Sequence, residues 1–133
     1  MIEAGRRERV LYLGIGDGSA ARRLARQAVE GLVVGVDPSE DRVRQARRLA
    51  ADQDNVMFVP GSAEEIPWRE DFFSLLVAEE AALAGADPAR AAREMLRVMA
   101  PDGKVVVEGA AVEWRGLLAE TAAREKPGVT VVR

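Results

Sequence analysis

Short apolar runs alternate with amphipathic stretches along this chain. The runs are almost wholly apolar, which is typical of parallel strands covered on both faces. They predict strands over Val10–Leu13, Leu32–Asp37, Val56–Val59, Phe72–Val77, Lys104–Glu108 and Val129–Val132. Apolar residues at helical spacing lie between these strands. They predict helices over Ala20–Val29, after Pro38–Ser39, after Asp87–Pro88 and over Val112–Arg124.

Local signals refine the ends of these elements. Ser39 is predicted to cap the helix that follows it. Ser62 and Glu65 have the spacing of a capping box, so we expect a short helical turn between them. Met99 is expected on the apolar face of the third helix, and Pro101–Gly103 predicts a turn before the next strand.

The alternation of strands and helices predicts βαβ units. Their right-handed crossovers place helices on both faces of a parallel sheet. We therefore predict an α/β fold with a doubly wound, mostly parallel, Rossmann-like sheet of about six strands. Since no repeat or linker interrupts the pattern, we expect residues 1–133 to form a single domain.

Composition removes several kinds of chemistry. Histidine and cysteine are both absent, which excludes a Ser-His-Asp triad, a thiol nucleophile and a disulfide. No metal site is expected. The net charge of −3 gives no electrostatic signal for nucleic acid, and the clustered arginines are interpreted as solvated surface. No apolar run approaches the ~20 residues of a membrane span, and no signal peptide is evident, so we expect a cytoplasmic protein.

Three glycines at alternate positions follow the first predicted strand. Gly14, Gly16 and Gly18 stand directly before a predicted helix. Glycine lets another group approach the backbone closely, and a helix N-terminus adds unpaired N–H groups. Asp37 ends the next strand, nineteen positions after Gly18, where a carboxylate reaches the ribose diol of a ligand seated on the turn. The pattern therefore predicts a nucleoside site.

The glycine spacing bears on which nucleoside is bound. A dinucleotide fingerprint has a third glycine or alanine where this chain has Ser19, and Gly18 comes one position early. This weakens a nicotinamide hypothesis. No Gly-Lys-Ser/Thr sequence follows the turn, so the stretch is not a phosphate-binding P-loop.

Four stretches in order resemble the motifs of the class I S-adenosylmethionine-dependent methyltransferase family. They are VLYLGIGDGSA, VVGVDPSEDRVRQAR, MFVPGSAEEIPW and DPARAAREMLRVMAPDGKVVV. The resemblance covers about Val10 to Glu108. It implies S-adenosylmethionine as the cofactor and a small methyltransferase type 11-like domain.

The resemblance also implies roles for particular residues. The glycines of the turn would line the methionine and ribose part of the cofactor, Asp37 would bind the ribose hydroxyls, and Ser62 and Ala63 would flank adenine. The implied cofactor site contains Tyr12, Gly14, Ile15, Gly16, Gly18, Asp37, Pro38, Ser62 and Ala63. The segment Ala78–Glu80 would face the sulfonium and the substrate.

Tyr12 departs from the family pattern, which usually has an acid there that helps hold the cofactor's amino group. Tyr12 would then offer its hydroxyl or ring face to a cation, or be a strand aromatic. Ser62 also stands where the family often has aspartate. Glu79 and Glu80 are catalytic candidates that would orient or deprotonate an acceptor, or else they are solvated loop carboxylates.

The chain is short for this family. Only nine residues precede the first predicted strand, and one short strand follows the last helix, so the sheet is expected to be truncated relative to the seven-stranded family fold. The acceptor site would be open or completed by another subunit. The edge at Val129–Val132 would favour a partner or a homodimer.

The sequence supports three hypotheses in order. The first is an S-adenosylmethionine-dependent methyltransferase that acts on an unidentified small-molecule acceptor. The second is a catalytically inactive methyltransferase-like binding or partner module, which Tyr12, Ser62 and the missing lid favour. The third is an NAD-binding oxidoreductase, which the glycine spacing disfavours.

Overall fold

The computed structural model describes residues 2–109 and 112–132. Every neighbouring pair of strands in its sheet is parallel, and the strand order is β3-β2-β1-β4-β5-β6. The strands are β1 (Arg9–Leu13), β2 (Leu32–Asp37), β3 (Val56–Pro60), β4 (Phe73–Glu79), β5 (Met99–Glu108) and β6 (Thr130–Val131). This confirms the predicted doubly wound sheet. The order reverses between β1 and β4, and ligands of such sheets bind outside the carboxyl ends of the strands at that point.

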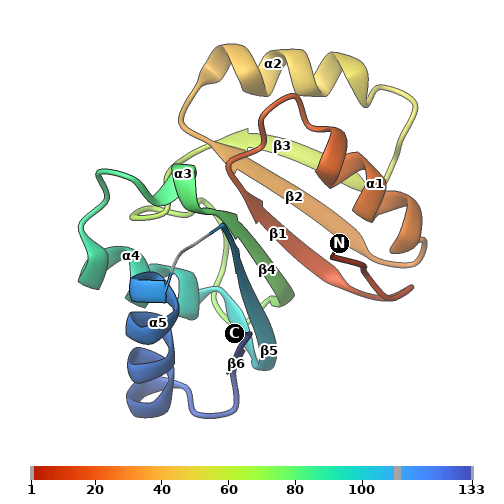
Figure 1. Cartoon of the computed structure of the whole chain (residues 1–133). Helices are drawn as coiled ribbons and strands as arrows, with labels where there is room; N and C mark the ends of the chain where they lie inside the picture. Colours follow the sequence, from red (N-terminus) through yellow and green to blue (C-terminus); the bar gives the residue numbers. More distant parts are fainter. Residues whose placement is uncertain (1, 110–111, 133) are drawn as a thin grey trace.

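Helices cover both faces of the sheet, as predicted. Figure 1 shows one pair of helices over β1, β2 and β3 and a second pair on the opposite side. The first pair is α1 (Ser19–Gln27) and α2 (Glu40–Leu49), and the second is α4 (Pro88–Arg97) and α5 (Val112–Glu125). A short helix, α3 (Glu80–Leu83), follows β4 directly. This helix therefore lies at the carboxyl end of the sheet.

Alternate residues of the central strands enter two separate apolar clusters. On β1, Val10 and Tyr12 pack toward α1 and α2, whereas Leu11 and Leu13 pack toward α4 and α5. This alternation follows from the two-residue repeat of a strand. It explains why the runs are apolar throughout, because each face of the sheet is covered by helices.

The predicted helix starts are confirmed in two places. The Ser39 hydroxyl accepts a hydrogen bond from the N–H of Arg42, at 3.2 Å, and so caps α2. The Asp87 carboxylate accepts one from the N–H of Ala89, at 3.1 Å, and Pro88 is the first residue of α4. Proline suits this position because its missing N–H would have no partner within the helix.

The helical turn predicted at Ser62–Glu65 is wrong. Ser62 and Glu65 instead exchange two backbone hydrogen bonds, of 3.3 and 3.1 Å, across an isolated antiparallel bridge. Pro67 accounts for the difference, because a proline disfavours helical backbone at the residue before it. A helix that began at Ser62 could not continue through Ile66.

Two boundaries near the centre of the sheet also differ from the prediction. Met99 belongs to β5 rather than to a helix face, and the predicted turn Pro101–Gly103 lies within the same strand. The pairing of β5 with β4 shifts register there, so the strand begins early but irregularly. Likewise β4 begins at Phe73 rather than at Phe72, and its end at Glu79 falls within the predicted end segment Ala78–Glu80.

The central position of β4 makes Leu76 a test of the core. Leu76→Ala should lower the free energy of unfolding by about 2–5 kcal/mol, because a fully buried leucine leaves a cavity when it is truncated. Leu49→Ala is the matched control, since Leu49 is 47% exposed and should cost about 0.5 kcal/mol or less. Urea denaturation measures both. Equal losses in the two variants would contradict this packing.

Candidate functional site

The turn between β1 and α1 passes through three left-handed glycines. Gly14, Gly16 and Gly18 have φ values of 88°, 57° and 84°. Residues with a Cβ rarely adopt such angles, so the backbone path itself requires glycine here. The turn lies at the carboxyl end of β1, beside the point where the strand order reverses.

The surroundings of the three glycines differ. A Cβ on Gly18 would stand 3.1 Å from both Ala46 and the Phe58 ring, so this glycine allows the turn to pack closely against α2 and β3. A Cβ on Gly14 would stand only 2.7 Å from the Cβ of Ala82. Around Gly16, in contrast, no other atom of the described residues lies within 4 Å of the corresponding Cβ position. The turn is therefore open to a ligand at Gly16 and confined at its two ends.

Asp37 lies beside the turn at the end of β2. It is only 2% exposed, yet both of its carboxylate oxygens accept hydrogen bonds from backbone N–H groups. Oδ1 accepts from Ser39 at 2.9 Å and Oδ2 from Ile15 at 3.3 Å. The guanidinium of Arg42 is 3.9 Å from Oδ1. The fold thus brings the predicted acid and the predicted turn into direct contact.

The loop after β3 begins next to Asp37. Gly61 donates its N–H to the Asp37 carbonyl at 3.2 Å. Two residues further on, Ala63 is buried and Ser62 is half-buried, whereas Pro38 on the other side of Asp37 is exposed. The candidate adenine residues therefore follow directly from the strand that neighbours Asp37.

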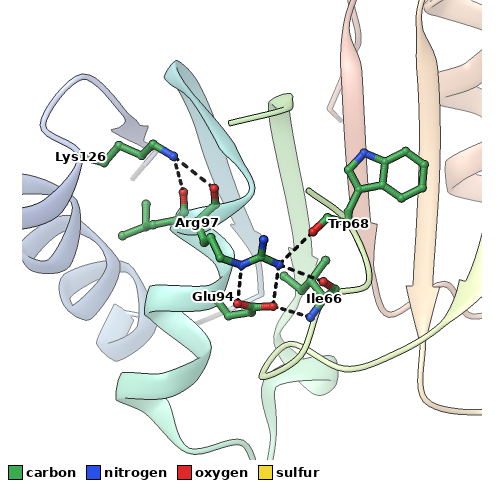
Figure 2. A network of polar contacts seen from close by, with 6 residues as sticks. Ile66, Trp68, Glu94, Arg97 and Lys126 are labelled. Carbon is green, nitrogen blue, oxygen red and sulfur yellow. Dashed lines mark hydrogen bonds and ion pairs between the residues drawn. The ribbon is translucent and has the colours of Figure 1, made fainter. Parts of the chain in front are cut away.

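An ion pair on α4 holds the same loop in place. Figure 2 shows Arg97 donating to the carbonyls of Ile66 and Trp68, both at 3.0 Å. Glu94 accepts from the N–H of Ile66 at 2.7 Å and pairs with Arg97 at 2.8 Å. Sequence reasoning missed this network. Its only sequence signal is an acid and an arginine three positions apart, because the partners on the loop are backbone groups.

Tyr12 and Glu79 join β1 to β4. Tyr12 is 6% exposed, and its hydroxyl donates a hydrogen bond to Oε1 of Glu79. Burial, the bond to Glu79 and the negative charges of Glu79 and Glu108 raise the pKa of the Tyr12 phenol well above its ordinary value, against the opposing charge of Arg23. Tyr12 therefore stays protonated. It is a buried aromatic residue of β1 whose hydroxyl donates a hydrogen bond to a carboxylate.

The two catalytic candidates line one cavity. A cavity of about 730 Å³ opens at the carboxyl ends of β4 and β5, and its walls include Glu79, Glu80, Glu108, Glu113 and Trp114. Glu79 is the last residue of β4 and is half-buried, whereas Glu80 begins α3 and is exposed. A small molecule could enter this cavity, which adjoins the glycine turn through Glu79.

Neither a membrane-spanning helix nor a metal-binding cluster occurs within the described ranges 2–109 and 112–132. No helix there is long and apolar enough to cross a bilayer. No group of three or more carboxylates there is arranged to hold a metal ion.

Comparisons with known proteins agree with this geometry. The family model described as a methyltransferase domain matches residues 11–107. A demethylmenaquinone methyltransferase of Clavibacter sepedonicus is 32% identical over 100 residues, which are 75% of this chain and 40% of that protein. This chain spans about two fifths of the length of the curated relatives it matches.

Solved structures resemble the chain as well. A methyltransferase of Aquifex aeolicus that depends on S-adenosylmethionine superposes with a TM-score of 0.74 at 20% identity, over 89% of this chain and 73% of that one. A Haloferax volcanii protein, solved in complex with the Trm112 methyltransferase activator, has a TM-score of 0.67 at 29% identity. That match covers 75% of this chain and 44% of the other.

The network on α4 predicts a pH-dependent stability. Hydrogen bonds from Arg97 and then from the Ile66 N–H lower the pKa of Glu94, although burial opposes them. This stabilisation is present above the unfolded-state pKa of about 4.3 and is lost as the pH falls through the lower folded-state pKa. Glu94→Gln should therefore lower the free energy of unfolding by about 1–3 kcal/mol at neutral pH. At about pH 3 the same substitution should lower it by much less.

Urea denaturation of both proteins at the two pH values tests this. Glu120→Gln, on an exposed part of α5, is the control and should change little at either pH. A difference between the wild type and Glu94→Gln that is the same at both pH values would contradict the prediction.

Proposed function

Since this chain belongs to the methyltransferase domain family, we propose that it transfers a methyl group from S-adenosylmethionine to a small-molecule acceptor. The observation that carries the proposal is the contact between the buried Asp37 carboxylate and the glycine turn, through the N–H of Ile15. This arrangement presents a fixed acceptor for ribose hydroxyls next to an open stretch of backbone at Gly16.

The donors and acceptors at the turn fit the cofactor. Each oxygen of Asp37 has two lone-pair sites, so one backbone bond on each leaves room for a ribose hydroxyl. Gly16 lets the ligand lie against the backbone. We assign the adenine to Ser62 and Ala63, with Pro38 and Ile15 as neighbours of the ribose. Glu94 and Arg97 would act as positioning residues by fixing the loop that carries Ser62 and Ala63.

The chemistry needs little from the protein beyond geometry. The cofactor supplies a methyl group on a positively charged sulfur, which is a good leaving group. The task of the chain's own residues would be to hold the acceptor in line with that methyl group, and such positioning would supply much of the acceleration. We propose that Glu80, which lines the cavity, orients the acceptor and takes its proton. The half-buried Trp114 would shield the cavity from water.

One observation favours the second candidate, a binding module without turnover. The first turn of α3 approaches the glycine turn so closely that a Cβ on Gly14 would meet Ala82 at 2.7 Å. If α3 keeps that position, it leaves little room beside Gly14 for a ligand that crosses the turn. Binding of the cofactor without methyl transfer to any acceptor would support this alternative.

Association with other chains is a separate part of the proposal. Among the described residues, the edge strand β6 pairs with β5 alone, and an open edge can accept another strand. The Haloferax volcanii protein that resembles this chain was solved with an activator. We propose that a second copy or another subunit completes the acceptor site. The cytoplasmic setting and the single domain remain predictions.

Calorimetric titration distinguishes the candidate cofactors. The wild-type chain should bind S-adenosylmethionine and S-adenosylhomocysteine but not NAD, because Ser19 stands where the dinucleotide fingerprint has its third glycine or alanine. Binding of NAD alone would contradict the proposal. Binding of neither sulfur nucleoside would remove the methyltransferase assignment for this chain.

Asp37 gives the sharpest single-residue test of the ribose assignment. Asp37→Asn should weaken binding of S-adenosylhomocysteine by about 1.5–3 kcal/mol, the usual value of a charged hydrogen bond. Asp41→Asn is the matched control, because Asp41 is an exposed first-turn residue of α2 and should leave the affinity unchanged. Thermal unfolding checks that both variants are folded. An unchanged affinity in a folded Asp37→Asn variant would exclude Asp37 from the site.

A further inference from the structure

We propose that Glu79, held by Tyr12, binds the positively charged half of S-adenosylmethionine. The carboxylate would accept a hydrogen bond from the cofactor's ammonium group and lie near its sulfonium. This inference rests on the proposed cofactor. It assigns Glu79 to the cofactor and leaves Glu80 as the group that faces the acceptor.

The strand pairing places Glu79 at the glycine turn. In the register of β1 and β4, Tyr12 lies opposite Val77 and Leu13 opposite Ala78. One step further along the two parallel strands, Glu79 comes beside Gly14. A Cβ on Gly14 would indeed stand 3.2 Å from the Cβ of Glu79. The carboxylate therefore adjoins the turn on the β4 side, whereas Asp37 adjoins it on the β2 side.

Tyr12 fixes the direction of this carboxylate. Its ring packs in the apolar cluster under α1, so the side chain has little freedom, and its hydroxyl donates to Oε1 of Glu79. No donor of residues 2–109 and 112–132 forms a hydrogen bond with the other oxygen, Oε2. A carboxylate that is held by one oxygen and free at the other is prepared to accept a bond from a ligand.

Charge at the same place favours a cationic ligand. Glu108 lies opposite Glu79 in the pairing of β5 with β4, so two carboxylates stand side by side. Within the part of the chain that the structure describes, neither has a lysine or arginine within 4.0 Å. At neutral pH S-adenosylmethionine has an ammonium, a sulfonium and a carboxylate and a net charge of about +1, whereas the product lacks the sulfonium and is neutral overall. The two carboxylates should therefore bind the charged cofactor more strongly than the product.

The positions of the two acids on either side of the turn suit a ligand that contacts both of them. The ribose would lie on Asp37, the chain of the cofactor would cross the glycines, and the amino acid end would reach Glu79. The cavity begins beyond Glu79, so the methyl group would point toward Glu80 and Trp114. One ligand would then connect the two parts of the site.

Titration with three ligands tests this assignment. S-adenosylmethionine carries both cationic groups, S-adenosylhomocysteine carries the ammonium only, and 5′-methylthioadenosine keeps the adenine and ribose without the amino acid. Glu79→Gln should lower the affinity for the first two ligands by about ten- to hundredfold, with the larger loss for S-adenosylmethionine. It should change the affinity for 5′-methylthioadenosine by about twofold or less. Glu113→Gln, which alters an exposed wall of the same cavity, should leave all three unchanged.

The results separate this inference from the proposed cofactor. If the wild type binds S-adenosylmethionine and Glu79→Gln lowers the affinity for all three ligands equally, or for none of them, the inference is overturned and the cofactor assignment stands. If the wild type binds none of them, the proposed cofactor itself fails. Tyr12→Phe decides the case in which Glu79→Gln does not fold. This variant removes only the hydroxyl. It should lower the affinity for S-adenosylhomocysteine several-fold and leave the affinity for 5′-methylthioadenosine unchanged. Equal changes in the two affinities would overturn the inference.

Discussion

The backbone of the turn after β1 can follow its path only because Gly14, Gly16 and Gly18 have positive φ. This path brings the N–H of Ile15 to the Asp37 carboxylate and lets α1 start against α2 and β3. A side chain at Gly18 would push those elements apart, and one at Gly14 would displace α3. Both the packing of the sheet's carboxyl edge and the placement of the acids therefore depend on this turn.

Two acids flank the turn from neighbouring strands. β2 supplies Asp37 and β4 supplies Glu79, since these strands lie on either side of β1 in the sheet. Their chemical surroundings differ. Asp37 is held by backbone N–H groups, whereas Glu79 is held by the Tyr12 hydroxyl. This difference suits a ligand that is neutral and hydroxyl-rich at one end and cationic at the other.

Local sequence determines some of these features and not others. The strands and Asp37 were predictable, because an apolar run and the acid that ends it are local signals. The Tyr12–Glu79 contact was not, because it requires β4 to lie beside β1, and strand order is a property of the whole chain. The bridge at Ser62 was missed because Pro67 overrides the capping signal. The contacts of Arg97 with the loop involve carbonyls, which every residue has.

In the proposed complex, one nucleoside lies across the glycine turn with its ribose on Asp37. A crystal structure of the chain with S-adenosylhomocysteine tests this most directly. We expect ribose hydroxyl oxygens within about 2.5–3.0 Å of the Asp37 carboxylate, and ligand atoms in contact with the backbone of Gly16. A ligand bound elsewhere, or a ribose directed away from Asp37, would contradict it.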